Sequence, residues 1–342
     1  MPTKYVYMER FSGVKIADIP MNDRKVYDLL ISTEPLGLKP EDIDSQTGTF
    51  GLPELGTTFV RQMLVEAQPK TFSDLLQISG LSHGTGVWLG NARDLIADGT
   101  CTISECIGTR DSIMVYLSHC GLDSGDAFTI METVRKKNKF LSEKQIEVMR
   151  SKNVPEWYID SANKIEYMFP KAHAVAYDIS AIRLGWYKVY YPIAFYAAMF
   201  TVAPGGFDAE IVMKGKEFVK GQIAEINAKG KEASAAEKDL IPIWQLVVEF
   251  YARGLEFLPV SLERSKAKTF MPEDGKVRIP FSALPGLGVK AAESIEEVMA
   301  DGGVLSVEEL RERSKISKTH VEILKRNGVL DGISETTQIR FF

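Results

Sequence analysis

Apolar residues recur along most of this chain at the three- and four-residue spacing of an α-helix, and this periodicity limits the fold more than any other feature. The segment 71–78, for example, has apolar side chains at 72, 75, 76 and 78. Alternation with the two-residue period of a β-strand is weak, and 276–280 is the best short strand candidate. The sequence therefore predicts a mainly α-helical protein.

Several helices can be placed by local signals. Ser142 and Gln145 form the capping box that starts a helix through residue 150. The apolar stretch 184–202 contains a lysine and a proline, so we expect a buried helix pair rather than a membrane span. The segment 207–253 indicates two charged amphipathic helices, broken near residues 229–230.

The chain is long enough for two domains, because 342 residues exceed the usual size of a single hydrophobic core. Its hydrophobic fraction of 45% and charged fraction of 25% are those of an ordinary globular protein. Turn residues at 272–275 lie within 259–280, which we interpret as a linker. We place the domain boundary there.

The cysteines and histidines indicate no metal site. A zinc site formed by Cys101, Cys106, His119 and Cys120 is conceivable, but the spacing matches no familiar zinc pattern. Reduced, mostly buried thiols are the preferred interpretation. The first residues carry no apolar signal region, so we expect a cytoplasmic protein without a membrane role.

A glycine-rich hairpin lies near the C-terminus. The segment runs Leu284-Pro285-Gly286-Leu287-Gly288, with Lys290 in the helix that follows. We expect both glycines to permit positive φ and close backbone approach, so that main-chain N–H groups face a phosphate while the leucines anchor the hairpin. This pattern predicts a helix-hairpin-helix unit that grips DNA without reading its sequence. A glycine-rich helix cap in an unrelated fold is the alternative.

A second, degenerate hairpin follows within 306–331, where two more short helices are expected and the last one closes at Gly328. The chain then ends in a glutamine, an aliphatic residue and two aromatics, which are similar to the peptide by which bacterial replication proteins bind the sliding clamp. The residues predicted to bind the clamp are Gln338, Ile339, Phe341 and Phe342. A tail tucked onto the protein's own surface is the alternative.

A cation, an imidazole and an aromatic ring share one face at a predicted helix start. Lys171 and His173 begin the helix, and Tyr177 lies one turn beyond His173. Such a face can meet a triphosphate and stack on a base. The loop 77–91, rich in small and hydroxyl residues, suits the close approach of a phosphate or sugar. A capped helix with a core histidine is the alternative.

These segments, together with 32–37, 51–56 and 59–63, resemble the PolC type of bacterial DNA polymerase III, and the resemblance covers nearly the whole chain in order. It implies a mainly α fold: a helical fingers domain and then a small duplex-binding domain with two helix-hairpin-helix motifs. The implied boundaries are 1–30 for a remnant that follows the palm, 31–260 for the fingers, 261–335 for the hairpins and 336–342 for the clamp-binding tail.

The resemblance also implies which residues bind the incoming deoxynucleotide. Arg110 would neutralise triphosphate oxygens with Lys171, and His173 would contact the phosphates or sugar. Phe169 and Tyr177 would shape the base pocket. The residues implied to line the neighbouring loop are Ser79, Ser82 and His83.

No catalytic residue is expected in this chain. The family's chemistry needs carboxylates that hold two Mg²⁺ ions in the palm, and the resemblance begins after them; Asp42 and Asp44 lie in a family loop instead. We therefore expect no metal ligands here, no polymerisation by the chain alone, and the N-terminal part of the polymerase, primer-template DNA, dNTP and the clamp as partners at the replication fork.

The origin of the chain stays open at this point. The leading hypothesis is a piece of the polymerase: a fragment, a split gene product or an incomplete reading frame. A non-catalytic DNA- and clamp-binding protein derived from a polymerase gene is the alternative function, and a helical scaffold without DNA affinity is a third.

Overall fold

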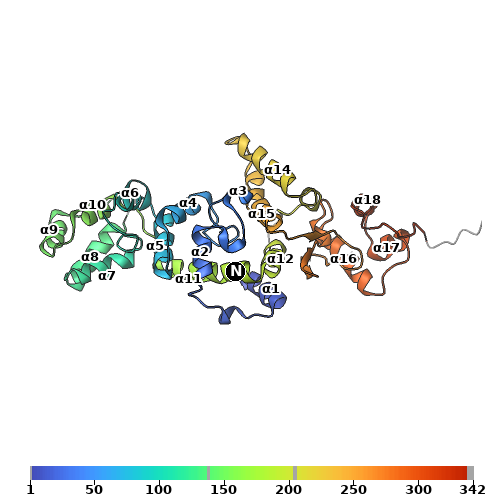
Figure 1. Cartoon of the computed structure of the whole chain (residues 1–342), viewed down its shortest axis with the longest axis horizontal. Coiled ribbons are helices and arrows are strands. Elements are labelled where there is room, and N and C mark those ends of the chain that lie inside the picture. The colour runs from blue at the N-terminus through green and yellow to red at the C-terminus, as the bar shows by residue number, and fades with distance from the viewer. Residues whose placement is uncertain (1, 137–138, 203–205, 337–342) are drawn as a thin grey trace, which may run out of the picture. The chain divides into compact units, whose positions relative to one another are not determined.

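The computed structural model describes residues 2–136, 139–202 and 206–336. Helices dominate, and the one sheet among these residues has three short strands, so the predicted mainly α fold is confirmed. The chain divides into two compact units (Figure 1). We call Ile19–Pro40 with Asp44–Val189 the pocket unit, and Met1–Asp18, Glu41–Ile43 and Tyr190–Phe342 the hairpin unit.

The named elements among the described residues of the pocket unit are all helices or helical turns. Its elements are α2 (Arg24–Ile31), η2 (Glu34–Leu36), α4 (Thr58–Ala67), α5 (Phe72–His83), the π-helical turn η3 (Trp88–Ala92), α6 (Arg93–Ala97), α7 (Arg110–His119), α8 (Ser124–Val134), α9 (Glu143–Ser151), α10 (Glu156–Lys164) and most of α11 (Lys171–Tyr190). Helix α9 starts at Ser142 with the predicted capping box to Gln145.

A buried lysine fixes one side of the pocket unit. Lys188 of α11 is fully buried, and its Nζ donates to the carbonyl oxygens of Gly48 and Phe50 at 2.6 and 2.7 Å. One turn earlier, Gly185 lies against Val26 of α2, where an added Cβ would come within 3.1 Å of Val26 Cγ1. Helix α11 therefore holds both α2 and the loop before α4.

The hairpin unit carries the remaining elements. These are α1 (Pro2–Ser12), η1 (Ile16–Asp18), α3 (Pro40–Ile43), α12 (Pro192–Val202), α13 (Ala209–Val212), α14 (Lys216–Lys229), α15 (Ala235–Ala252), β1 (Phe257–Leu258), β2 (Met271–Glu273), β3 (Lys276–Arg278), η4 (Phe281–Ala283), α16 (Val289–Ala300), α17 (Val307–Ser314) and α18 (Lys318–Arg326). Helices α14 and α15 are the pair predicted for 207–253.

Aromatic rings form the centre of this unit. Phe250 of α15 stacks on Phe257 of β1 with the ring centroids 4.2 Å apart, and Phe200 of α12 packs against both rings. The stretch 184–202 comprises the end of α11 and the whole of α12, so the predicted helix pair is confirmed. Every helix in the described part of the chain is too short or too polar to span a lipid bilayer.

The interpretation of 259–280 as a linker is wrong. Strands β2 and β3 lie in this segment and pair antiparallel through a turn at Asp274 and Gly275, whose φ angles are 51° and 77°. Strand β1 pairs parallel with β3. Strand β3 lies within 276–280, the predicted strand candidate, whereas β1 and β2 contain too little alternation to stand out, and the pairing of the three strands could not be predicted from periodicity.

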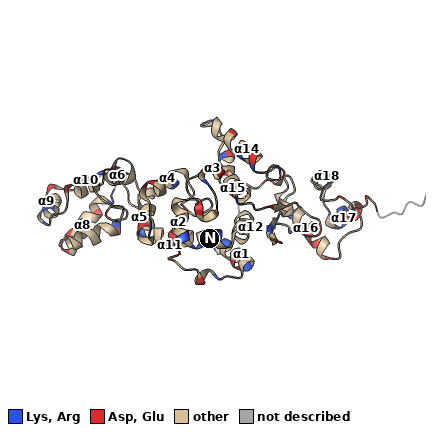
Figure 2. Ribbon diagram, viewed as in Figure 1, with Lys and Arg blue, Asp and Glu red and all other residues tan. Residues whose placement is uncertain are grey.

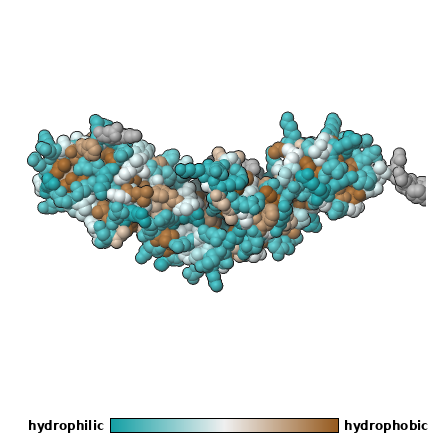
Figure 3. All heavy atoms as spheres, turned by 90° about the horizontal axis from the view of Figure 1, so that it is seen from above, coloured by the Kyte–Doolittle hydropathy of each residue, from teal (hydrophilic) through white to brown (hydrophobic). Residues whose placement is uncertain are grey.

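Charges and apolar side chains are mixed over the surface. Lys and Arg are interspersed with Asp and Glu over both units (Figure 2). The face seen in Figure 3 is mostly hydrophilic, with small, separate hydrophobic patches. Such scattered patches are normal for a folded protein and do not by themselves indicate a binding site.

Candidate nucleotide pocket and candidate nucleic-acid interface

A small cavity of about 120 Å³ lies in the pocket unit, between the end of α5 and the start of α11. Its lining residues are Glu54, Ser79, His83, Phe169, His173, Ala174 and Tyr177. The structure therefore brings together five of the eight residues predicted for the nucleotide site, and Ser82 bonds to one of them.

Four rings form a continuous run along this cavity. His83 stacks on Phe169 with centroids 4.6 Å apart, and Phe169 meets His173 edge-on at 5.2 Å. His173 then contacts Tyr177 at 4.7 Å. His173 is exposed, while Phe169 and Tyr177 are half-buried, so the run presents aromatic and imidazole surface to a ligand.

The chain between α5 and α11 explains why His83 and Phe169 meet. Thr85 N donates to Tyr167 O at 3.0 Å, and Glu166 N donates to Thr85 O at 2.9 Å. Gly86 has a φ of 71°, and an added Cβ would lie 2.1 Å from Lys164 O. Glycine is thus required for the loop after α5 to lie against the segment before α11.

Polar contacts fix the His83 ring. Its Nε2 lies 3.0 Å from Glu54 Oε2, and its Nδ1 lies 2.9 Å from Ser79 O and 2.8 Å from Ser82 Oγ. The Glu54 carboxylate and the Ser79 carbonyl oxygen can only accept hydrogen bonds, so both ring nitrogens lie against acceptors. Glu54 is a site residue that the sequence did not predict; its φ of 62° marks it as unusual only once the backbone is known.

A buried carboxyl lies beside the cavity. Asp178 of α11 is 1% exposed and accepts a hydrogen bond from Ser79 Oγ at 2.7 Å. Its sequence signal is an acid on the apolar face of a helix, one residue after Tyr177, and it was not predicted as a site residue. Burial raises the pKa of Asp178 to about 7, opposed by the Ser79 hydrogen bond and by His83.

Arg110 and Lys171 lie outside the set of described residues that line the cavity. Arg110 is the first residue of α7, half-buried, with Asp111 as an ion-pair partner at 4.0 Å. The residue two before it, Gly108, packs on α5, since a Cβ added at Gly80 would lie 2.1 Å from Gly108 O. Lys171 is exposed at the first position of α11. Their predicted role in triphosphate binding stays a prediction.

The cysteines pack rather than gather ligands. Cys101 and Cys106 are buried with their Sγ atoms 3.4 Å apart, and burial raises the pKa of each thiol. Across 2–136, 139–202 and 206–336, no group of three or more His, Cys, Asp or Glu side chains is arranged to hold a metal ion.

The predicted DNA-binding hairpin precedes α16 in the hairpin unit. Leu284 and Leu287 are each 2% exposed and anchor it, as predicted, while Pro285 is half-buried. Gly286 has a φ of 85°, and an added Cβ would lie 3.0 Å from Ile323 Cδ1. Gly286, Gly288 and Lys290 are exposed.

Positive φ at Gly288 was predicted wrongly. Its φ is −63° and its ψ 159°, because it is the N-cap of α16, a position with extended backbone. A Cβ at Gly288 would meet nothing within 4 Å, so the chain's own packing does not require glycine there. No side chain in the described part of the chain caps α16, so its first amides lack a side-chain acceptor.

A second hairpin between α17 and α18 repeats the same backbone order. Lys315 has a φ of 53°, Ile316 is buried, and Ser317 is the N-cap of α18 with extended backbone. Here Ser317 Oγ accepts a hydrogen bond from the His320 N–H at 3.2 Å. The side chain of the cap residue therefore satisfies an amide at the start of α18, whereas Gly288 offers no such side chain to α16. The two hairpins thus share a shape and differ at the cap.

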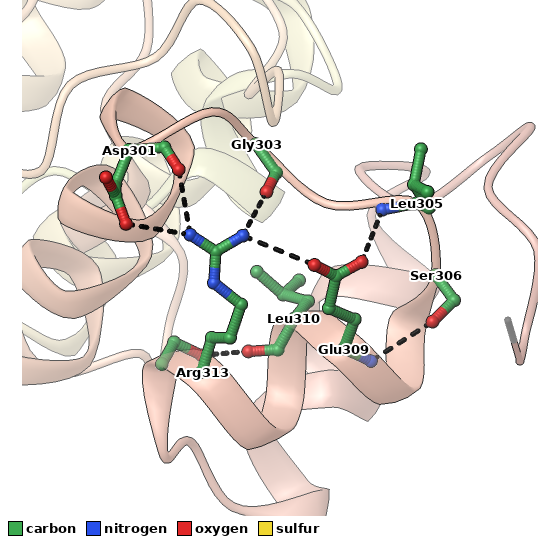
Figure 4. Close-up of polar contacts among 8 residues, drawn as sticks. Asp301, Gly303, Leu305, Ser306, Glu309, Leu310 and Arg313 are labelled. Atoms are coloured by element: carbon green, nitrogen blue, oxygen red, sulfur yellow. Dashed lines mark hydrogen bonds and ion pairs between the residues drawn. The ribbon is translucent and has the colours of Figure 1, made fainter.

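The loop that joins α16 to α17 is held by one arginine (Figure 4). The Arg313 guanidinium donates to the carbonyl oxygens of Asp301 and Gly303, while Glu309 accepts from Leu305 N. Ser306 Oγ accepts the Glu309 N–H at 3.1 Å and caps α17. These contacts keep the two hairpins on one small helical core. The predicted clamp-binding residues, Gln338, Ile339, Phe341 and Phe342, lie outside the described residues.

Comparison with known families defines the class of protein. Residues 2–154 match the finger domain of the bacterial DNA polymerase III alpha subunit, and residues 254–338 match a helix-hairpin-helix motif. The second match contains both hairpins, and the first contains Ser79, Ser82, His83 and Arg110. Two regions of the chain are therefore similar to a polymerase III finger domain and to a helix-hairpin-helix motif.

Individual relatives narrow this class. The chain is 49% identical over 341 residues to the PolC-type DNA polymerase III of Clostridium perfringens, and 46% identical over the same length to those of Caldanaerobacter subterraneus and Bacillus subtilis. Each alignment covers 100% of this chain and 24% of the relative. The chain is homologous over its whole length to PolC-type DNA polymerase III, and it spans about a quarter of the length of these relatives.

Proposed function

We propose that this chain supplies the nucleotide-binding and duplex-gripping parts of a replicative, DNA-directed DNA polymerase. The ring run from His83 to Tyr177, beside the hydroxyl groups at the end of α5, is the observation that carries the nucleotide half of the proposal. Homology to PolC-type polymerases carries the assignment to replication.

The cavity takes part of a deoxynucleotide rather than all of it. Pockets that enclose a whole small ligand usually measure about 300–1,000 Å³, and this one measures about 120 Å³. Phe169 and Tyr177 offer ring faces for a base, while His173 reaches the sugar or phosphates. Arg110 and Lys171, outside the cavity, neutralise the triphosphate.

The first hairpin binds the sugar-phosphate backbone of the primer-template duplex. Exposed Gly286 and Gly288 leave room for a phosphate at the start of α16, where N–H groups and the helix dipole favour an anion. Lys290 adds a positive charge beside that position. Contacts of this kind predict affinity that falls steeply with salt and depends little on base sequence.

The tail Gln338–Phe342 binds the sliding clamp through its two aromatic residues. Its test is a pull-down of purified clamp by the whole chain and by a variant ending at residue 337. Retention by the whole chain and loss in the shortened variant support the proposal. If both proteins retain the clamp equally, the clamp binds another part of the chain or adsorbs non-specifically, and the proposal for the tail is wrong.

Nucleotidyl transfer requires residues beyond this chain. We propose that the Mg²⁺ ions and their carboxylates belong to the remaining part of the polymerase, so the chain binds substrates weakly by itself and acts with that part in the cytoplasm, at the replication fork. The residues of this chain then serve to bind and orient the nucleotide and the duplex for that transfer.

The deciding experiment combines nucleotide binding with primer extension. The chain is titrated with a fluorescent deoxynucleoside triphosphate and with a primer-template duplex, and is then mixed with the complementary N-terminal part of a PolC-type polymerase. Restored extension supports the proposal. DNA and clamp binding without any nucleotide affinity would favour a non-catalytic protein derived from a polymerase gene, and no salt-dependent DNA affinity would leave only a helical scaffold.

A further inference from the structure

The carboxyl of Asp178 occupies an unusual position beneath the ring run. Its Oδ1 accepts from Ser79 Oγ at 2.7 Å, while its Oδ2 is buried without a hydrogen-bond partner among the described residues. Ser79, on α5, and Tyr177, next to Asp178 on α11, both line the cavity. The hydrogen bond therefore ties α5 to α11, the two helices that carry six of the eight predicted nucleotide contacts.

The Asp178 carboxyl interacts electrostatically with His83 of α5 and Tyr27 of α2. The electrostatic interaction with His83 lowers the pKa of Asp178 against the rise caused by burial, and His83 is hydrogen-bonded to Glu54 on the loop before α4. On α2, the pKa of Tyr27 is raised, first by burial and then by the Asp178 carboxylate. His173 and Tyr177 lie on α11 itself. Since burial brings the pKa of Asp178 to about 7, its charge changes at neutral pH.

We propose that Asp178 is a positioning residue of the nucleotide pocket, which holds α5 on α11 through Ser79 and weakens triphosphate binding when it is ionised. The inference rests on the proposed nucleotide site. A carboxylate beneath the rings repels the phosphates and leaves Oδ2 as a buried, unpaired anionic oxygen. The neutral carboxyl keeps the tie to Ser79 without that repulsion.

The test is the affinity of the chain for a fluorescent deoxynucleoside triphosphate between pH 5.5 and 8.5, for the parent and for Asp178→Asn. Asparagine keeps a carbonyl oxygen for Ser79 and carries no charge. The parent should lose affinity as pH rises through about 7, by roughly threefold to tenfold for a charge nearby, whereas Asp178→Asn should be flatter and tighter at pH 8. Equal pH slopes for the two proteins would overturn the inference.

Two controls separate Asp178 from other titrations. A terminal phosphate titrates near pH 6, so the measured quantity is the difference between variants rather than the slope of the parent. Asp160→Asn, at an exposed position of α10, should follow the parent at every pH. If Asp178→Asn does not fold, Ser79→Ala replaces it: loss of the hydrogen bond should move the affinity drop to higher pH, and an unmoved drop contradicts the proposal.

Thermal unfolding distinguishes this inference from the proposed function. The folded-state pKa of about 7 lies above the ordinary value of 3.8, so the folded protein holds a proton that the unfolded chain releases. Stability therefore falls as pH rises from about 4 to 7, and Asp178→Asn should gain in Tm relative to the parent across that window. If the Tm values differ as expected but no variant binds nucleotide, the proposed function is rejected, and with it the role of Asp178 in nucleotide binding. If all variants bind nucleotide with the same pH dependence, only the role of Asp178 is rejected.

Discussion

The cavity of the pocket unit and the first hairpin of the hairpin unit offer different chemistry to a phosphate-bearing ligand. Around the cavity, the groups offered to a ligand are rings and titratable side chains of α5, of α11 and of the segment just before α11. Their positions depend on side-chain contacts such as that of Ser79 with Asp178. At the hairpin, exposed glycines leave the backbone itself in reach.

This difference predicts which site should be specific for its ligand and which should tolerate side-chain substitutions. A side-chain site can select a nucleotide by shape and charge, and it is lost when one ring or cation is removed. A backbone site binds any duplex and is lost only when the main chain is blocked or bent. Substitutions should therefore separate the two activities cleanly.

The largest effect is expected from Gly286→Val combined with Gly288→Val. Valine is strained at a φ of 85° and crowds the start of α16, so two backbone contacts of about 1.5 kcal/mol or more each should be lost, roughly a hundredfold in DNA affinity. Fluorescence anisotropy with a labelled duplex measures it, and nucleotide affinity should not change. Gly302→Val, with its φ of 90° in the α16–α17 loop, is the matched control, and a melting curve must show both variants folded.

Arg110→Ala should reduce nucleotide affinity by about tenfold, because one charge-assisted contact is worth roughly 1.5–3 kcal/mol. Duplex affinity should stay within error of the parent. Arg24→Ala, which removes a guanidinium of α2 that is 87% exposed, provides the control in the same unit. An equal loss of nucleotide and DNA binding on Arg110→Ala would show that the comparison between the two sites is wrong.

Phe169→Ala should weaken nucleotide binding by about fivefold, since stacking on one base contributes about 1 kcal/mol or more. It also removes the ring on which His83 stacks. Titration with each of the four deoxynucleoside triphosphates checks the effect, which should be similar for all of them. Phe128→Ala, at an exposed position of α8, is expected to do nothing, and unchanged affinity on Phe169→Ala would place the base elsewhere.

The smallest effect sharpens the contrast between the two hairpins. Ser317→Gly gives the second hairpin the open cap of the first, at a stability cost of only a few tenths of a kcal/mol. The freed amides of α18 should raise duplex affinity by about twofold or less. Ser142→Gly, which removes the equivalent cap of α9 in the pocket unit, should leave duplex binding unchanged. Weaker DNA binding by Ser317→Gly would mean that the serine itself contacts the phosphate.

The sequence by itself determined helix starts such as that of α9 and the anchoring of the first hairpin. Ser142 with Gln145 specifies a helix start because a capping box is closed by bonds within four residues. Leu284, Gly286 and Leu287 specify the hairpin because their roles depend on neighbouring backbone. The prediction for Gly288 failed at the same scale, because glycine at an N-cap needs no positive φ.

Only the tertiary structure decided which distant residues share a site. His83 meets Phe169, and Ser79 meets Asp178, because the loop after α5 pairs with the segment before α11. Likewise, the short strand β1 finds β3 across a long loop, and Lys188 is buried because two carbonyl oxygens lie at its Nζ. Local patterns contain no information on such pairings, since each depends on the path of the whole chain and on the burial it produces.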